Sequence, residues 1–87
     1  MKELEKSFIG KGEVRGFEFT QIKKNEKAFI YRVDTGDSTH YEVFKRKINK
    51  MYDCESYPRS KSFGLWAWSK GSLKKANELF EELSAEV

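Results

Sequence analysis

The chain has 87 residues, of which 38% are hydrophobic and 36% charged, and its formal net charge is +3. This length suits one compact domain that buries roughly 60 to 65% of its unfolded surface, and it leaves no room for a second core. The aromatic share of 15% argues against a disordered chain, because disordered sequences are poor in aromatic residues. We therefore expect a single small domain over residues 1–87.

The cysteine content and the N-terminal residues bear on the location of the protein. Cys54 is the only cysteine, so no internal disulfide can form, whereas small secreted domains usually carry several. Residues 1–6 mix charges where a signal peptide would be apolar, and the longest apolar run is too short to span a bilayer. We expect a cytoplasmic protein with no membrane contact, either a monomer or a homodimer.

The first half of the chain has the pattern of a β-meander. Residues 1–9 fit either a short helix or an edge strand, and a glycine-containing breaker follows them. The alternation over residues 13–23 has the period of a strand, and residues 27–33 are rich in strand formers. Residues 34–38 have the composition of a hairpin loop. Two consecutive antiparallel strands are therefore expected here.

The second half contains two further strands and a helix. A third strand is expected over residues 40–48, where a switch of the apolar face indicates a bulge. Residues 53–62 read as the longest loop, and residues 63–68 as a strand with apolar residues on both faces. Residues 72–85 show an apolar stripe at helical spacing, with Ser72 as the expected N-cap. The whole pattern predicts an α+β fold: an antiparallel sheet of three to five strands with one C-terminal amphipathic helix packed on one face.

Two groups of residues are compatible with catalysis. Asp34-Thr35-Gly36 matches the triplet that carries the catalytic aspartate of aspartic proteases, which need two carboxylates sharing a proton; a hairpin turn explains the triplet as well. His40 and Cys54 are the only residues of their kinds, and nothing in the sequence brings them together as a nucleophilic pair. One Cys and one His also fall short of a four-ligand zinc set. We expect no enzyme activity, no metal site and no cofactor.

Basic residues are concentrated in one part of the chain. Residues 45–75 hold nine Lys or Arg against two acidic residues, and such a local excess attracts polyanions. The densest cluster, residues 45–50, lies among aromatic residues, which suits a nucleic acid because cations pair with phosphates while bases stack on rings. Such a cluster is more often an edge strand whose charges deter aggregation.

Lysines at the expected helix start form a second group. Lys70, Lys74 and Lys75 stand where the helix dipole disfavours cations; either an anion binds there or solvent screens the mismatch. Residues 70–76 resemble the Ser-Lys-Lys-x-Ala that opens the last helix of double-stranded-RNA-binding domains, with Leu73 interrupting the match. The order of three strands and a helix resembles the arm-site domains of phage-type integrases and plant AP2-type domains. These resemblances imply contact with nucleic-acid phosphates.

Together these signals predict a small non-enzymatic binding module whose basic face contacts nucleic acid. The expected phosphate-binding residues are Lys45, Arg46, Lys47, Lys50, Arg59, Lys70, Lys74 and Lys75. The expected aromatic platform consists of Tyr41, Tyr52, Trp66 and Trp68, with the two indoles on one strand face, although a core position is the more common one for such indoles. The alternative is a protein-interaction module or homodimer that uses the aromatic strand or an open sheet edge.

Overall fold

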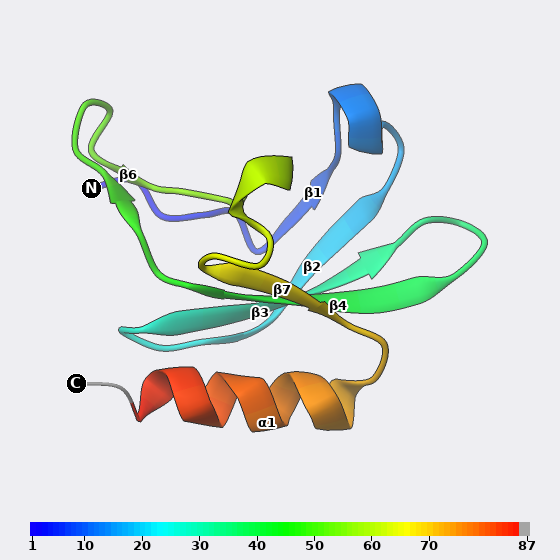
Figure 1. Ribbon diagram of the computed structural model, residues 1–87. Helices are drawn as coiled ribbons and strands as arrows, with labels where there is room; N and C mark the ends of the chain where they lie inside the picture. The colour runs from blue at the N-terminus through cyan, green and yellow to red at the C-terminus, as the bar shows by residue number, and fades with distance from the viewer. Residues whose placement is uncertain (86–87) are drawn as a thin grey trace.

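The computed structural model describes residues 1–85, and the last two residues of the expected domain lie outside the described part. A five-stranded antiparallel sheet has the order β1-β2-β3-β4-β7 (Figure 1). Its strands are β1 (Ser7–Ile9), β2 (Glu18–Lys24), β3 (Ala28–Asp34), β4 (Thr39–Lys45) and β7 (Ala67–Lys70). The other elements are the two-stranded sheet β5 (Ile48–Asn49) and β6 (Cys54–Glu55), the 3-10 helices η1 (Gly12–Val14) and η2 (Ser60–Ser62), and the helix α1 (Leu73–Ser84). The expected α+β class is confirmed.

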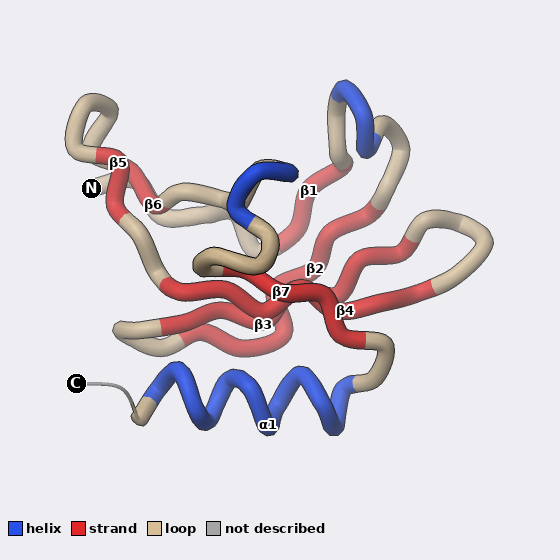
Figure 2. Tube along the Cα trace, viewed as in Figure 1, coloured by secondary structure: helices blue, strands red, loops and turns tan. Residues whose placement is uncertain are grey.

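The helix α1 covers one face of the sheet, as Figures 1 and 2 show. Its N-cap is Ser72, as expected, because the Ser72 side chain accepts a hydrogen bond of 3.3 Å from the backbone N–H of Lys75. Every third or fourth side chain of α1 then faces the strands. The buried core between α1 and the sheet consists of Ala28, Ile30, Val43, Ala76, Phe80 and Leu83.

The opposite, helix-free face of the sheet carries a second core. Tyr57 packs on it at steep ring angles, with centroid distances of 5.4 Å to Phe19, 5.2 Å to Tyr31 and 4.9 Å to Phe44. The N-terminal segment and the chain between β6 and β7 cover this face (Figure 1). Its buried residues are Phe19, Phe29, Tyr31, Val33, Phe44 and Ala67.

The middle of the chain differs from the prediction. The expected third strand ends at Lys45, and Ile48 starts β5 in the separate two-stranded sheet. The strand β4 pairs with β3 without interruption, and its apolar residues lie on both sides because both faces of the sheet are covered. The register shift lies instead in β2, between Gln21 and Lys23. The change of apolar face in β4 therefore reflects burial on both sides of the sheet and not a bulge.

The expected strand over residues 63–68 is also wrong in its bounds. Gly64 has a φ of 91°, and its N–H donates to the Ala67 carbonyl at 2.8 Å, so the chain turns before β7 begins. Because of this turn Trp66 packs on the core of the helix-free face, whereas Trp68 packs on the core beneath α1. The two indoles therefore do not share a face. No helix within residues 1–85 is long and apolar enough to cross a bilayer.

Candidate functional site

A buried ion-pair network holds the segments that cover the helix-free face. The Glu55 side chain is fully buried, and its Oε2 lies 2.6 Å from Arg46 Nε and 3.1 Å from Lys24 Nζ. Its Oε1 accepts from the Leu4 backbone N–H at 2.9 Å. Burial alone would raise the pKa of Glu55, but the bonds from Arg46, Leu4 and Lys24 outweigh it and hold that pKa below its usual range. One carboxylate thus joins the N-terminal segment, β2, the residue after β4, and β6.

Above this network the β5–β6 hairpin, residues 48–55, projects from the body of the protein (Figures 1 and 2); we call it the arm. The Asn49 side chain accepts hydrogen bonds from the backbone N–H groups of Met51 and Tyr52, at 3.0 and 3.3 Å, and so fixes the turn. Met51 is 82% exposed and Tyr52 is 73% exposed, with Lys50 exposed beside them. The arm presents an aromatic ring and a cation together.

The N-terminal residues buttress the arm from the side. The Lys2 N–H donates to the Asp53 carbonyl at 2.9 Å, and the Glu55 N–H donates back to the Lys2 carbonyl at 2.9 Å. The N-terminal ammonium lies 3.5 Å from the Asp53 carboxylate. The exposed Lys2 side chain is therefore close to the base of the arm, a position that depends on long-range pairing and gives no signal in sequence.

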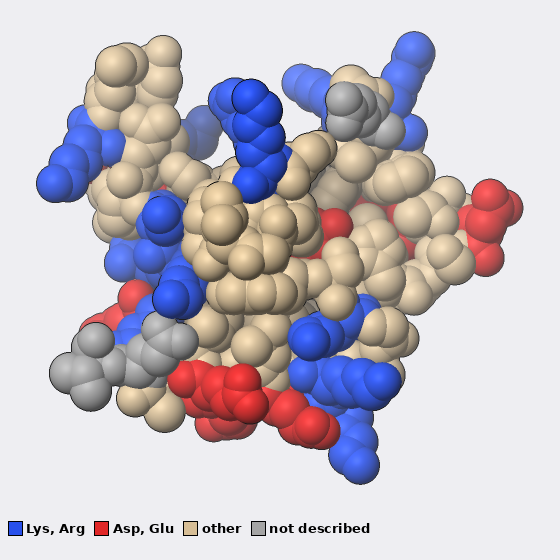
Figure 3. Space-filling model, in the orientation of Figure 1, with Lys and Arg blue, Asp and Glu red and all other residues tan. Residues whose placement is uncertain are grey.

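The eight expected phosphate-binding residues do not converge on one face. Lys45, Arg46, Lys47 and Lys50 run from the end of β4 into the arm, while Lys70, Lys74 and Lys75 lie at the start of α1. Arg59 precedes η2 on the helix-free side. In Figure 3 the basic side chains gather at separate places, with acidic side chains of α1 between two of them. Of the four residues at the first place, Arg46 is engaged with Glu55, and Lys47 Nζ lies 5.2 Å from the centre of the Trp66 ring.

Arg32, which sequence reasoning missed, lies on the same face of the sheet as the lysines at the start of α1. Arg32 lies opposite Tyr41 in the β3–β4 pair, and Tyr41 lies opposite Lys70 in the β4–β7 pair, so the three share the helix-covered face. Among the acidic side chains that the structure describes, none forms an ion pair with Arg32, Lys70, Lys74 or Lys75. Tyr41 packs against the core beneath α1 and is half-buried. Only the strand register, which the sequence does not give, brings Arg32 to this place.

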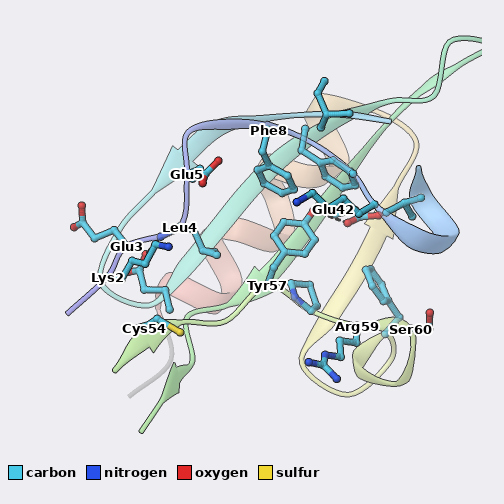
Figure 4. A pocket seen from close by; sticks show the side chains of 18 residues that line it. Lys2, Glu3, Leu4, Glu5, Phe8, Glu42, Cys54, Tyr57, Arg59 and Ser60 are labelled. Carbon is cyan, nitrogen blue, oxygen red and sulfur yellow. Dashed lines mark hydrogen bonds between the residues drawn. The ribbon is translucent and has the colours of Figure 1, made fainter. Parts of the chain in front are cut away.

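A groove of about 1060 Å³ opens on the helix-free face between the N-terminal segment and residues 54–63. Figure 4 shows the side chains of Phe8, Tyr57 and Glu42 together at its centre, with Arg59 and Ser60 to one side and residues 2–5 to the other. Phe8 stacks on Phe19 with a centroid distance of 4.7 Å, which continues the aromatic floor. The groove is therefore apolar at its base and carries its charged residues mainly at the rim.

Glu42 is the charged group in the floor of the groove. Its side chain is 14% exposed, and Oε1 accepts a 2.6 Å hydrogen bond from the Tyr57 hydroxyl. Its Oε2 lies 3.1 Å from His40 Nε2, and no Lys or Arg within residues 1–85 pairs with it. Burial raises the pKa of Tyr57, and the adjacent Glu42 carboxylate raises it further, so this hydroxyl remains a donor. The sequence signal that could have identified this site is Glu42 itself, a charged residue in a strand that is otherwise apolar on both faces.

No protein-family model, curated protein or solved structure matches the chain. Function has to be inferred from the chemistry of its own side chains.

The residues that suggested catalysis form local contacts and do not come together. Asp34 Oδ1 accepts from the Gly36 N–H at 2.9 Å, and Gly36 has a φ of 94°, as a hairpin turn requires. His40 contacts Glu42, whereas Cys54 pairs with Asn49 in the arm, and no hydrogen bond within residues 1–85 joins the two. No group of three or more potential metal-binding side chains occurs among the described residues.

Proposed function

We propose that the protein is a small non-enzymatic module that binds single-stranded nucleic acid through its arm. The observation that carries this proposal is the 73% exposure of Tyr52 at the tip of a projecting hairpin, next to Lys50. Stacking on an exposed ring requires an unpaired base, which is why single strands are the favoured ligand. The basic residues near the arm then pair with the phosphates on either side of the stacked base.

The contacts that fix the arm to the rest of the protein support this role. A ligand loses affinity when it has to order a flexible loop, so a binding hairpin benefits from being fixed beforehand. The Glu55 network and the backbone bonds between Lys2 and the arm provide that fixation. Tyr52 is thereby held away from the body of the protein, where a base can reach its ring.

Lys50 in the arm, and Lys47 and Lys2 beside it, are the expected phosphate contacts. Each lysine that neutralises a phosphate of a single strand adds about 0.7 to the slope of log affinity against log salt concentration. The cations at the start of α1 lie apart from the arm. In this proposal Lys70, Lys74 and Lys75 raise the positive potential that attracts the strand and contribute less to the bound complex.

A protein-interaction module or homodimer is the second candidate. Exposed Tyr and Met side chains are typical anchors of protein interfaces, and Met51 and Tyr52 share the tip of the arm. The strands β1 and β7 also lie at the outer sides of the sheet, where another chain could add a strand. Substitution of Tyr52 separates the two candidates. Only the nucleic-acid candidate predicts that the protein binds an oligonucleotide and that this binding weakens with salt.

The test is a fluorescence-anisotropy titration of a labelled oligothymidylate and of a duplex, at roughly 50 and 200 mM salt. We expect Tyr52→Ala to weaken binding of the single strand by about 5- to 150-fold, the range for loss of one base stack. Lys50→Gln should lower the salt slope by about 0.7. The matched controls are Leu65→Ala, an equally exposed apolar residue outside the arm, and Lys6→Gln, an exposed lysine outside it.

Single-strand binding that neither salt nor Tyr52→Ala changes would overturn the proposal. A concentration-dependent dimer that Tyr52→Ala dissociates, with no oligonucleotide bound, would establish the second candidate instead.

A further inference from the structure

Glu55 and Glu42 are two carboxylates largely removed from water, and they are compensated in different ways. Glu55 is fully buried and has both Arg46 and Lys24 as ion-pair partners. Glu42 is 14% exposed, and its partners are the Tyr57 hydroxyl and the His40 imidazole. A carboxylate removed from water without a full counter-charge is unfavourable unless something else balances it. No Lys or Arg within residues 1–85 neutralises Glu42, so a cation from outside the protein could pair with it.

The surroundings of Glu42 have room for such a cation. The groove above it measures about 1060 Å³, just above the range of roughly 300–1,000 Å³ for small-molecule sites. Its walls include Leu4, Val14 and Phe63, and its floor includes Phe8 and Phe19. Apolar and aromatic walls with a small number of polar groups are the usual composition of a ligand pocket, and aromatic rings also attract cations.

We propose that this groove binds a small organic cation, an ammonium or guanidinium group on an apolar body, with Glu42 holding the positive charge. The apolar body displaces water from the aromatic floor, and the charged nitrogen reaches Glu42, which lines the groove beside Phe8 and Tyr57 (Figure 4). Tyr57 occupies only Oε1 of the carboxylate, through its 2.6 Å hydrogen bond. This site is separate from the tip of the arm, so the inference does not depend on the proposed function.

The rim of the groove carries charges of both signs. Lys2, Lys11 and Arg59 line it together with Glu3 and Glu5, and all five residues are exposed to solvent. Charges exposed to solvent are screened by salt much more than a charge in a half-closed floor. Glu42 therefore determines which sign of ligand can enter, and an anion would meet an uncompensated carboxylate of the same sign.

The experiment compares three probes of matched shape: 2-phenylethylamine, 2-phenylethanol and 3-phenylpropionate. Binding is measured by NMR titration at about pH 8. We expect the amine to bind at least tenfold more tightly than the alcohol, the propionate to bind least, and the shifts to centre on Phe8, Phe19 and Phe63. Glu42→Gln should lower the affinity of the amine to that of the alcohol, while Glu78→Gln, on exposed α1 surface, should change nothing.

Tyr57→Phe provides a second check, because it frees Glu42 Oε1 while keeping the ring. The affinity for the amine should then be equal or higher. Propionate binding as tightly as the amine, or no binding of any probe at millimolar concentration, would overturn the proposal. If Glu42→Gln fails to fold, the order of the three probes on the unsubstituted protein still decides it.

Discussion

Arg46 Nε lies 2.6 Å from Oε2 of Glu55, inside the protein and at the meeting point of four chain segments. This pair helps to attach the segments that cover the helix-free face to the sheet. On the other face, the apolar stripe of α1 attaches the helix to the sheet. A hydrophobic stripe is insensitive to pH, whereas a carboxylate network is not. The two sides of the sheet should therefore respond differently to acid.

The first prediction concerns stability in acid. The pKa of Glu55 is held below its ordinary value of about 4.5, so its stabilising effect is complete above that pH and is lost as the pH falls through the lower folded-state pKa. The free energy of unfolding, measured by urea denaturation, should fall steeply below about pH 4.5. Glu55→Gln should flatten this fall and reduce stability at neutral pH by about 2 to 4 kcal/mol, because it leaves Arg46 and Lys24 without their partner. Equal acid slopes for the two proteins would contradict the assignment.

The second prediction concerns alkaline pH. Burial, reinforced by Glu42, raises the pKa of Tyr57, so the folded state is stabilised below the ordinary tyrosine pKa of about 10 and loses that contribution as the pH rises above it. Tyr57→Phe should lower stability at neutral pH by about 1.5 to 3 kcal/mol through the lost hydrogen bond to a charged group. It should also weaken the dependence of stability on pH above 10. Denaturation curves, together with the ultraviolet absorbance of tyrosinate, check both effects.

The third prediction concerns a close approach of two backbone segments. A Cβ at Gly10 would meet the Val14 carbonyl oxygen and lie 2.9 Å from a ring carbon of Phe19. Gly10→Ala should therefore destabilise the protein by about 1 to 3 kcal/mol, with loss of thermal stability as the measurement. Gly71→Ala is the control, because nothing lies within 4 Å of the added Cβ. A neutral Gly10→Ala would mean that the turn between β1 and η1 is looser than described.

The fourth prediction concerns the start of the helix. Ser72→Ala removes the acceptor for the Lys75 N–H and should lower stability by about 1 kcal/mol. Ser69→Ala, in the exposed part of β7, should have no comparable effect. Thermal unfolding of the two variants distinguishes a cap at Ser72 from one three residues earlier.

The elements that sequence predicted well depend on local periodicity. The α1 helix follows from its apolar spacing and Ser72, and β3 follows from its strand-forming residues. The strand expected over residues 13–23 is wrong at its start, because Gly12–Val14 form η1 and β2 begins only at Glu18. The arm could not be predicted, because β5 and β6 have two residues each and form only through pairing with each other and buttressing by Lys2. The separation of Trp66 and Trp68 depends on the turn at Gly64 rather than on strand alternation.

The candidate sites depend almost wholly on long-range contacts. Glu42 and Tyr57 are 15 residues apart in sequence, and Leu4 and Glu55 are 51 apart. Sequence reasoning identified Lys50 and Tyr52 as candidates, but it expected them to join cations that the fold places elsewhere. It did not find Glu42, although a charge between Tyr41 and Val43 was visible as an exception in an otherwise apolar stretch.

The placement of the two indoles gives the protein a built-in pair of optical reporters. Trp66 senses the layer attached through Glu55, and Trp68 senses the layer formed by α1. With Trp66→Phe or Trp68→Phe, the remaining emission follows one layer at a time. Mild acid should therefore shift the emission maximum of Trp66 to longer wavelength before that of Trp68, because the segments attached through Glu55 detach from the sheet before α1 does.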